Sequence, residues 1–460
     1  MTAISETESL CPVCLRVLPA RIVREGDEIL LCRDCPEHGP SREAIWRGQP
    51  DFESWRRPKA PASGVRSHRP GERGCPYDCG LCPEHAQHPC TVLLEISQRC
   101  DLVCPVCYAS SGRPGAGDLD LDLLSGWLPL IRSEAGQVVL QISGGEPTLH
   151  PGLEELVAQA ARLFPAVQLN TNGLRLAREP DLARRLREAG LAWVFLQFDS
   201  LRDETLLALR GRAMAREKLA AVEALEKAGM PTVLVPTVAK GVNDQELGEL
   251  VRFGVGRPLV RGLHFQPMTS SGRNGLQGAE ARLTLPELLT ELGRQTGGDV
   301  DVGQAFPPGC EHERCSFHLR FRRLADGRLV PRPGSEGQCC GGAPPKTTPV
   351  PSGPAETAAG RDRAVDIILR SWRPGGDREP TAPAGAIPMA RRAPDAFDEF
   401  IDRAARESFS LTAMAFQDAW TVDLARLRGC CVHVFSPPDR FVPFCAMNLT
   451  SALGQPLYRG

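Results

Sequence analysis

The stretch from Cys100 to Tyr108 reads Cys-Asp-Leu-Val-Cys-Pro-Val-Cys-Tyr and places the thiols of Cys100, Cys104 and Cys107 at the spacing C-x3-C-x2-C. It directly follows Thr91–Ser97, an apolar run that predicts a buried strand. Iron–sulfur clusters usually take four thiolates, so three would leave one iron of a cubane open for a small chelating ligand. The alternatives are a zinc site without its fourth ligand or buried thiols, and both leave this spacing unexplained.

The composition limits the class of protein. The 460 residues are enough for two or three domains, and the net charge of -2 gives no support for a nucleic-acid partner. No stretch reaches the roughly 18 consecutive apolar residues of a membrane span. Residues 1–10 lack the basic and apolar regions of a secretory signal. We therefore expect a cytoplasmic protein, in which the 18 cysteines bind metal rather than form disulfides.

The first cysteine island predicts a four-thiolate site. It consists of two C-x2-C knuckles at the two ends of a predicted hairpin, Cys11 with Cys14 and Cys32 with Cys35. A tetrahedron of four sulfurs suits both zinc and a single rubredoxin-like iron, so the metal remains open. A pair of disulfides is the alternative, which the cytoplasmic interpretation disfavours.

The second island predicts a closed cluster. Cys75, Cys79, Cys82 and Cys90 have the spacing C-x3-C-x2-C-x7-C, so the spacing of residues 100–107 recurs here with a fourth thiol present. We interpret this island as an auxiliary [4Fe-4S] cluster, with zinc as the alternative. His85 and His88 lie in the same loop, and we assign them no role because solvated loop histidines are commoner than ligands.

Between residues 91 and 267, apolar strands alternate with helical patterns, which predicts an α/β fold with a parallel sheet and helices outside it. Six such units are too few to close an eight-stranded barrel, so we expect an open (β/α)6 barrel. The predicted strands are Thr91–Ser97, Gln137–Ser143, Ala166–Asn172, Leu191–Asp199, Pro231–Val238 and Gly262–Pro267. The predicted helices are Leu123–Glu134, Leu153–Phe164, Asp181–Ala189, Ala213–Gly229 and Asp244–Phe253.

Glycines and polar residues follow the ends of these strands, where the chemistry of such folds gathers. The second strand ends at Gly144-Gly145-Glu146-Pro147, in which two glycines would let the backbone approach a ligand closely. Taken singly, each polar residue is as readily a loop cap, but the set at one rim favours a binding site. The other candidates for cofactor binding are Tyr108, Asn170, Asn172, Gln197, Asp199 and Gln266.

The late cysteines predict a second auxiliary cluster. Two predicted strands, Val432–Val434 and Arg440–Phe444, would form a hairpin that brings Cys431 and Cys445 together. Cys310 and Cys315 would then complete four thiolates, while Cys339, Cys340 and Cys430 remain unassigned. Among the apolar residues of the C-terminal third, the spacing favours core helices over an entrance for lipid chains. These apolar residues are Phe397, Phe400, Ile401, Phe409, Leu411, Met414, Phe416 and Trp420.

The islands divide the chain into six expected parts. Residues 341–393 are rich in Pro, Ala and Gly, which is typical of a linker, and one helical pattern, Ala364–Trp372, interrupts them. The parts are a rubredoxin-like module (1–62), an auxiliary cluster segment (63–95), the barrel (96–300), a second auxiliary cluster segment (301–340), the linker (341–393) and a C-terminal domain that completes the second auxiliary cluster (394–460).

The thiol motif with its following aromatic residue, together with Gly144–Pro147, resembles the radical S-adenosylmethionine (SAM) superfamily. More narrowly, the chain from Cys11 almost to Gly460 resembles the archaeal tetraether-lipid synthase family and its pterin-methylating relatives. That resemblance lies in residues 75–85 leading into the thiol motif and in the segments Leu196–Asp199, Phe265–Pro267, Phe416–Asp418 and Pro443–Asn448. It implies a partial (β/α)6 radical SAM barrel, a SAM-bound [4Fe-4S] cluster at the thiol motif, two auxiliary [4Fe-4S] clusters and one rubredoxin-like iron.

The resemblance also implies the chemistry. The open iron would bind the amino and carboxylate groups of SAM, and the cluster would cleave SAM to a 5′-deoxyadenosyl radical that takes a hydrogen atom from the substrate. We expect C–C bond formation on lipid chains first and methylation of a pterin-like heterocycle second. An iron–sulfur electron-transfer protein is a third alternative, against which Gly144–Pro147 argues. Peptide maturation is a fourth, but the late cysteines lack the dense spacing of a twin-cluster domain. The expected partners are the substrate, a ferredoxin or flavodoxin as reductant, and a membrane surface at most peripherally.

Overall fold

The computed structural model describes residues 2–57, 72–80, 82–274, 282–332, 407–437 and 440–459. The predictions for the linker 341–393, for the helix Ala364–Trp372, and for Cys339, Cys340, Phe397, Phe400 and Ile401 lie outside these residues. None of the helices in the described part of the chain has the length and apolarity that a membrane crossing needs.

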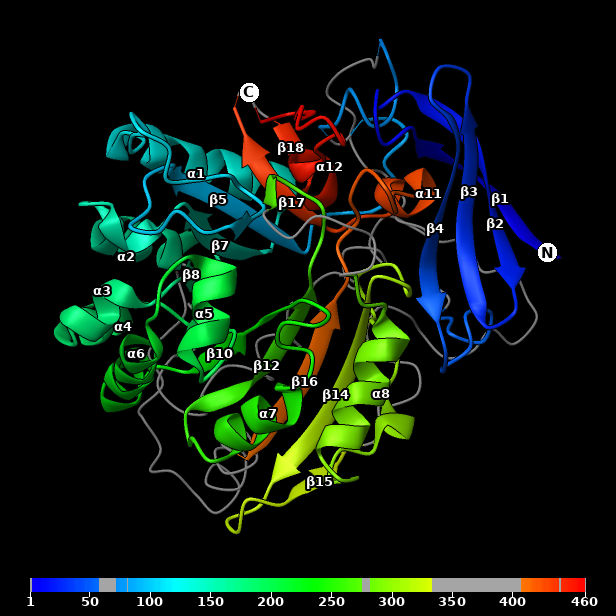
Figure 1. Ribbon diagram of the computed structural model, residues 1–460. Helices are drawn as coiled ribbons and strands as arrows, with labels where there is room; N and C mark the ends of the chain where they lie inside the picture. The colour runs from blue at the N-terminus through cyan, green and yellow to red at the C-terminus, as the bar shows by residue number, and fades with distance from the viewer. Residues whose placement is uncertain are drawn as a thin grey trace, which may run out of the picture.

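The chain begins with an antiparallel four-stranded sheet in the order β1-β2-β3-β4, drawn in blue in Figure 1. The strands are β1 (Thr2–Leu10), β2 (Val17–Glu25), β3 (Glu28–Cys35) and β4 (Gly39–Arg47). The predicted hairpin between β2 and β3 is confirmed, since Glu25 pairs with Glu28 across a two-residue loop. Such a loop needs a positive φ, and Gly26 supplies it at 59°.

A twelve-stranded sheet forms the body of the molecule, in the order β15-β14-β16-β12-β10-β9-β8-β7-β5-β17-β18, with β11 paired to β12. All neighbours from β16 to β17 run parallel, and the sheet stays open at its two outer strands, which confirms the open α/β prediction. The strands are β5 (Thr91–Ser97), β7 (Val139–Gly144), β8 (Ala166–Thr171), β9 (Trp193–Gln197), β10 (Thr232–Val235), β11 (Thr237–Val238), β12 (Val260–Pro267), β14 (Ser316–Arg323), β15 (Leu329–Pro331), β16 (Ser408–Met414), β17 (Val432–Ser436) and β18 (Arg440–Pro443). A separate pair joins β6 (Val106–Cys107) to β13 (Arg273–Asn274).

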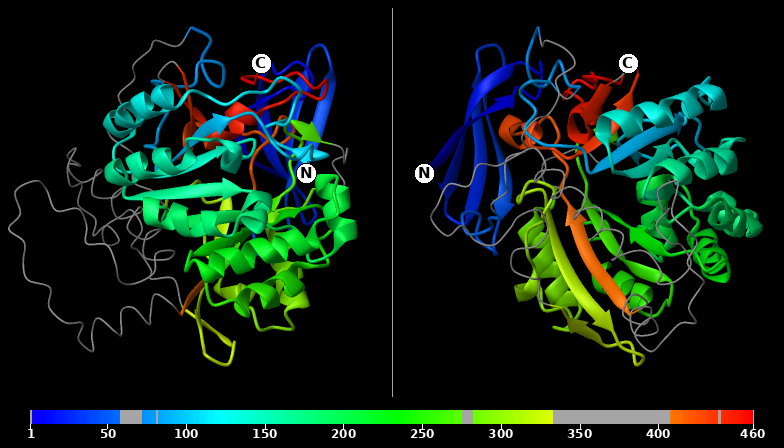
Figure 2. Two further views of the ribbon diagram at one scale, coloured as in Figure 1. Left: turned by 90° about the vertical axis from the view of Figure 1, so that its left-hand side faces the viewer. Right: turned by 180° about the vertical axis from the view of Figure 1, so that it is seen from behind.

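Helices between the parallel strands cover the outer side of the sheet (Figures 1 and 2). Helix α1 shows why they form: the Asp120 side chain caps its first turn, and Leu124, Leu128 and Ile131 pack on the sheet. The helices are α1 (Leu121–Ala135), α2 (Leu153–Leu163), α3 (Leu174–Arg178), α4 (Asp181–Ala189), α5 (Asp203–Arg210), α6 (Ala215–Lys227), α7 (Leu247–Val255), α8 (Leu285–Gln295), α11 (Leu424–Arg428) and α12 (Phe444–Asn448), with short 3-10 helices η1 (Pro147–Leu149) and η3 (Val302–Gln304).

The C-terminal part of the chain supplies both edges of the parallel sheet. Strand β16 lies beside β12, and β17 lies beside β5, so the two strands stand at opposite ends of the predicted barrel (Figure 1). The helical prediction for Phe409, Leu411 and Met414 is therefore wrong, because all three belong to β16, and Phe416 and Trp420 lie in the non-helical segment that follows. Strand β16 reads Ser-Phe-Ser-Leu-Thr-Ala-Met, and this alternation of polar and apolar residues has the two-residue period of a strand rather than the period of a helix.

Candidate active site and metal centres

The three thiols of the loop between β5 and β6 lie together at one end of a large cavity. Cys100, Cys104 and Cys107 all line it, and Cys104 is buried while the other two are partly exposed. Burial raises the pKa of the Cys100 thiol to about 12 and also raises that of Cys104. These sulfurs would therefore become thiolates at neutral pH only against a bound metal cation.

The two glycines at the end of β7 fix the chain that leads into this loop. A Cβ at Gly145 would lie 2.1 Å from the carbonyl oxygen of Arg99, and a Cβ at Gly144 would lie 2.3 Å from that of Ser97. The backbone N–H of Gly145 donates to Ser97 O (2.7 Å), and that of Glu146 donates to Arg99 O (2.7 Å). The glycines therefore allow a close approach of β7 to the residues just before Cys100.

Two arginines bind the backbone carbonyl groups of the thiol loop. Arg210 donates to the carbonyl oxygen of Val106 (3.0 Å), and Arg273 donates to that of Cys104 (2.5 Å). Arg210 is itself fixed by two hydrogen bonds to the fully buried Asp199 (2.6 and 2.8 Å). Asp199, a predicted cofactor ligand, lies outside the cavity lining and positions Arg210, which does line it.

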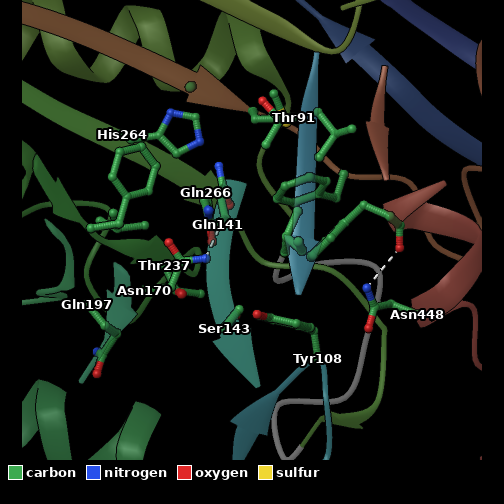
Figure 3. A pocket seen from close by; sticks show the side chains of 18 of the residues that line it. Thr91, Tyr108, Gln141, Ser143, Asn170, Gln197, Thr237, His264, Gln266 and Asn448 are labelled. Atoms are coloured by element: carbon green, nitrogen blue, oxygen red, sulfur yellow. Dashed lines mark hydrogen bonds between the residues drawn. The ribbon is translucent and has the colours of Figure 1, made fainter. Parts of the chain in front are cut away.

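The cavity has a volume of about 360 Å³ and extends along the inside of the sheet. Its lining includes residues at the beginning of the parallel strands, such as Thr91 and Trp193, and residues at their ends, such as Gly144 and Gln197. Figure 3 shows that its wall carries many polar side chains, labelled there on several strands. The space therefore accommodates a second molecule beside one bound at the thiol loop.

Hydrogen bonds link the polar side chains of three neighbouring strands across the cavity wall. Trp193 Nε1 donates to Gln168 Oε1 (2.8 Å), and Gln168 Nε2 donates to Asn170 Oδ1 (2.6 Å). Asn170 Nδ2 in turn donates to Gln141 Oε1 (3.2 Å). This series of amides from β9 through β8 to β7 presents oriented donors and acceptors to the cavity.

Two histidines on the facing strands add neutral imidazoles. Burial lowers the pKa of His264 to about 4 and that of His318 to about 3, so both rings are uncharged at neutral pH. His264 Nδ1 lies 2.8 Å from Thr412 Oγ1, and its ring centroid lies 5.6 Å from that of Phe195. This wall therefore combines a flat aromatic surface with hydrogen-bonding groups.

Most of the remaining predicted cofactor residues line the cavity. Tyr108, Asn170, Gln197 and Gln266 line the cavity. The Gln197 amide bonds to Asp199 and to Lys218, and Asn170 bonds to its neighbouring amides, so both side chains are held within the protein. Glu146 and Asn172 also line the cavity, and their side chains are likewise used within the protein. Glu146 accepts hydrogen bonds from Thr148, Thr171 and the backbone N–H of Asn172, and Asn172 Nδ2 donates to Asp101. Pro147 begins η1 and is absent from the lining.

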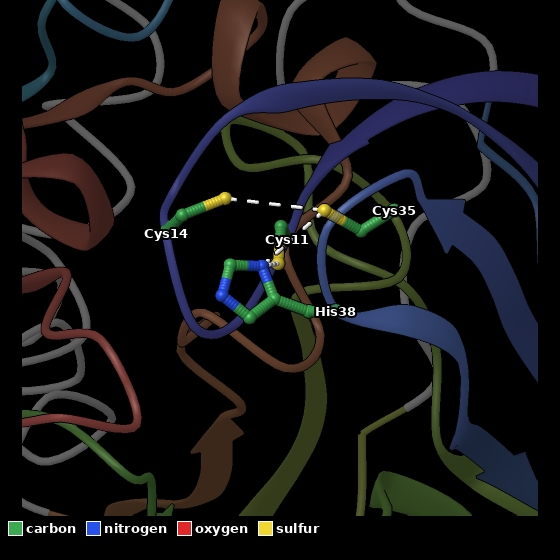
Figure 4. Close-up of side chains that lie close together, drawn as sticks. All are labelled: Cys11, Cys14, Cys35 and His38. Carbon is green, nitrogen blue, oxygen red and sulfur yellow. Dashed lines mark hydrogen bonds between the residues drawn. The ribbon is translucent and has the colours of Figure 1, made fainter.

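The first cysteine island forms a compact ligand set with a different membership from the predicted one. The ligand atoms of Cys11, Cys14, Cys35 and His38 all lie within 4.8 Å of one another, and Figure 4 shows the four side chains converging. With metal–ligand bonds of about 2.3 Å to sulfur and 2.0–2.1 Å to nitrogen, a zinc tetrahedron has S–S edges of about 3.8 Å and S–N edges of about 3.6 Å. The structure gives 4.0 Å for Cys14 to Cys35, and 3.6 and 3.5 Å from His38 Nδ1 to Cys11 and Cys35.

The predicted role of Cys32 is thereby corrected. Cys32 and Cys35 lie three residues apart on β3, and such residues point to opposite faces of a strand. Cys32 packs instead beside Val23, Leu30 and Ala44. Three thiols and an imidazole suit zinc, whereas a rubredoxin-like iron takes four sulfurs. His38 was missed, although it follows Cys35 at knuckle spacing in the turn before β4.

The second island and the late cysteines are also arranged differently from the prediction. Cys90 Sγ lies 3.2 Å from Cys431 Sγ, which in turn contacts Cys310. Cys90 is absent from the small cavity that Cys75, Cys79 and Cys82 line. The predicted hairpin of β17 and β18 is confirmed, and Cys431 and Cys445 stand at the same end of it.

Cys315 and Cys445 lie close to each other and to Cys430. Arg426 Nη2 is 3.1 Å from Cys315 Sγ, and the backbone N–H of Gln417 donates to Cys445 Sγ (3.3 Å). Cys430, which the sequence left unassigned, is close enough to Cys445 and Cys315 for their charges to raise its pKa further beyond the effect of burial. Only the tertiary pairing of β17 with β5 brings Cys90 to this group, so no local spacing could have predicted it.

Comparisons with known proteins agree with this architecture. Residues 94–254 match the family model described as Radical SAM superfamily, and residues 3–47 match the one described as HMPTM N-terminal zinc ribbon domain. The chain therefore contains a radical SAM domain, which makes it an enzyme, and an N-terminal zinc ribbon domain.

Individual relatives are similar to different parts of the chain. The chain is 28% identical to the 7,8-dihydro-6-hydroxymethylpterin dimethyltransferase of Methanocaldococcus jannaschii, over 96% of this chain and 93% of that protein. It is 29% identical to the GTP 3′,8-cyclase of Helicobacter pylori over 52% of this chain and 79% of that protein. The solved structure of Streptococcus suis SuiB bound to S-adenosylmethionine matches 46% of this chain and 47% of that one, with 16% identity and a TM-score of 0.38.

Proposed function

We propose that this enzyme is a radical SAM methylase that acts on a pterin-like heterocycle. The supporting observation is the alignment, over 96% of the chain, with a protein named as a hydroxymethylpterin dimethyltransferase. The sequence analysis put C–C coupling of lipid chains first and pterin methylation second, and this alignment favours the second. The GTP 3′,8-cyclases, which align with about half of the chain, are named for another fused ring system that contains a pyrimidine.

The cavity wall supports a heterocycle over an alkyl chain. The edge of a pterin alternates hydrogen-bond donors and acceptors, which complements the amides of Gln141, Asn170 and Gln266. An alkyl chain in the same space would offer no hydrogen-bond partner to the polar atoms of this wall that the other amides do not already bind. Each buried polar group left in that way costs ~1–3 kcal/mol.

The residues at the thiol end would hold the catalytic cofactors. Cys100, Cys104 and Cys107 would hold a [4Fe-4S] cluster, which with bound SAM supplies the 5′-deoxyadenosyl radical. Asn170 and Gln266, which line the cavity, would orient the bound molecules. Tyr108 closes the space behind the loop by packing on Phe444, with ring centroids 5.2 Å apart. The electron would come from a ferredoxin or flavodoxin.

We further propose two auxiliary [4Fe-4S] clusters, one at residues 75–85 and one at the thiol group of Cys310, Cys315, Cys431 and Cys445. The cavity beside Cys75, Cys79 and Cys82 supports the first. The convergence of late cysteines near Arg426, whose charge would balance that of thiolates, supports the second.

The test is anaerobic incubation of the reconstituted full chain with SAM, a reductant, a reduced folate-type methyl donor and 7,8-dihydro-6-hydroxymethylpterin, followed by mass spectrometry. We expect 5′-deoxyadenosine together with a pterin heavier by one or two methyl groups. Phospholipid vesicles offered in parallel should give no coupled product. Coupled lipid chains with an unchanged pterin would reverse the proposal.

A pair of matched variants tests the role of the cavity wall. Gln141→Leu removes an amide from the cavity, whereas Gln304→Leu makes the same change on the exposed η3. We expect Gln141→Leu to weaken pterin binding by about 10–100-fold, which corresponds to ~1–3 kcal/mol for one buried hydrogen-bonding group. Gln304→Leu should bind pterin as the unmodified chain does, and equal binding by all three proteins would contradict the proposed pocket.

A further inference from the structure

The tetrapeptide Cys-Pro-Glu-His occurs twice in this chain, as residues 35–38 and as residues 82–85. In the first copy, His38 completes a ligand set with Cys35 and with two further thiols of the zinc ribbon. In the second copy, the backbone N–H of His85 donates to the carbonyl oxygen of Cys82 (2.9 Å), so the chain turns back toward the cysteine. The same sequence therefore places a histidine three residues beyond a metal-binding cysteine in both places.

The second copy borders a cavity with three other candidate ligands. Cys75, Cys79, Cys82 and His85 all line the same small cavity, and His85 is only 7% exposed. Cys90, the expected fourth ligand, is not among the lining residues. The pairing of β5 with β17 keeps it with the other thiol group, where its N–H donates to Cys431 O (2.9 Å) and its Sγ lies 3.2 Å from Cys431 Sγ.

We infer that His85, and not Cys90, is the fourth ligand of the auxiliary iron–sulfur cluster held by Cys75, Cys79 and Cys82. This inference rests on the auxiliary cluster proposed above and is independent of the pterin substrate. Among the described residues, the only set of ligand atoms within 4.8 Å of one another, as a single ion requires, is that of the zinc ribbon. The candidate ligands around this cavity therefore do not form the compact set that a single ion requires.

A second histidine supports the imidazole from behind. His85 Nε2 lies 3.1 Å from His433 Nε2, and the two buried rings meet edge to face with centroids 4.8 Å apart. Iron binding through the other ring nitrogen, Nδ1, would leave the Nε2–H of His85 to donate to His433, and it would take the place of the bonds that this ring makes to the backbone of Cys430 and Gln87. Metal-bound histidines almost always donate the other ring N–H in this way, and the partner fixes the orientation of the ring.

A neutral imidazole in place of a thiolate has an electrochemical consequence. The cluster then carries one negative charge fewer. In Rieske centres, the replacement of cysteine by histidine raises the reduction potential. The cluster with His85 should therefore accept an electron more readily than the same cluster with four thiolates.

The test uses the full chain in which Cys100, Cys104 and Cys107 are replaced by Ala, so that only the auxiliary clusters contribute signals, and it omits SAM. The parent should carry about 8 irons from two cubanes. After reduction, pulsed electron paramagnetic resonance should show a strong ¹⁴N coupling, which ¹⁵N-histidine labelling should replace by a ¹⁵N coupling. His85→Cys should keep about 8 irons, lose the coupling and show a lower reduction potential.

His88→Gln is the matched control, because His88 lies in the same loop but outside the cavity lining, and it should keep the coupling. A coupling that persists in His85→Cys, or that is absent from a parent with about 8 irons, would overturn the inference. A parent with about 4 irons would instead contradict one of the two auxiliary clusters. In that case His85→Cys should also carry about 4 irons.

Discussion

The ligand set of the zinc ribbon predicts that one of two substitutions weakens zinc binding and that the other does not. His38→Ala removes the imidazole that lies 3.6 and 3.5 Å from the sulfurs of Cys11 and Cys35. Cys32→Ala removes a thiol that points to the other face of β3. Structural zinc sites contribute ~10–16 kcal/mol of binding free energy, so one ligand of four corresponds to ~3–4 kcal/mol. His38→Ala should therefore weaken zinc binding by about 100–1000-fold, and Cys32→Ala should leave it within about 3-fold.

The assay is competition for zinc between the full chain and a chromogenic chelator under anaerobic conditions, with metal content measured by mass spectrometry. We expect one zinc in the unmodified chain and in Cys32→Ala, and its transfer to the chelator in His38→Ala. If Cys32→Ala loses zinc as readily as His38→Ala, or if His38→Ala keeps the affinity of the unmodified chain, the assignment of the fourth ligand is wrong.

Three further predictions concern the rest of the chain. Replacement of the three thiols of residues 100–107 by Ala should abolish 5′-deoxyadenosine formation and leave zinc and about 8 irons bound; deoxyadenosine at the unmodified rate would contradict their role. The reconstituted full chain should carry about 12 irons and one zinc, and 13 irons without zinc would restore the rubredoxin-like interpretation. Arg282→Met should lower the free energy of unfolding by ~3–5 kcal/mol, because Arg282 bridges the buried carboxylates of Glu43 (2.7 Å) and Asp418 (2.6 Å). Arg294→Met, at an exposed ion pair, should cost less than ~1 kcal/mol, and equal thermal shifts for the two variants would contradict this difference.

The barrel could be predicted because its signals are local. Each buried parallel strand is a short apolar run, and each helix between strands shows its own periodicity, so Thr91–Ser97 and Asp181–Ala189 have the same bounds in prediction and structure. Helix α5 was missed because its eight residues carry only a short apolar stripe. The thiol loop could be predicted for the same reason, since its three thiols lie within eight residues of sequence.

The metal-ligand sets that depend on strand geometry or on the pairing of distant strands could not be predicted from the sequence in the same way. The C-x2-C spacing of Cys32 and Cys35 suggests a knuckle, but the extension of β3 to Cys35 turns the two thiols apart. Cys90 follows Cys82 at a plausible cluster spacing, yet its neighbour across the sheet is Cys431, 341 residues later. Local spacing thus identified the cysteines as ligands without deciding which of them share a metal.

The segment between β16 and β17 explains why so much of the site depends on the end of the chain. Residues 415–431 run from one edge of the parallel sheet to the other, and along this path Phe416 and Gln417 line the cavity. Arg33 of the zinc ribbon donates to the carbonyl oxygen of Trp420 (2.8 Å), and the hydroxyl of Ser9 donates to that of Val422 (2.5 Å).

The same segment also holds the late thiol group, because Arg426 contacts Cys315 and the N–H of Gln417 donates to Cys445 Sγ. The zinc ribbon, the second auxiliary cluster site and the cavity wall therefore share one stretch of backbone. A ribbon that loses its metal loses the rigid surface on which this stretch rests, since structural zinc sites supply folding energy directly. The loss of zinc should thus weaken pterin binding more than it weakens SAM cleavage, because the thiol loop is held separately by Arg210 and Arg273.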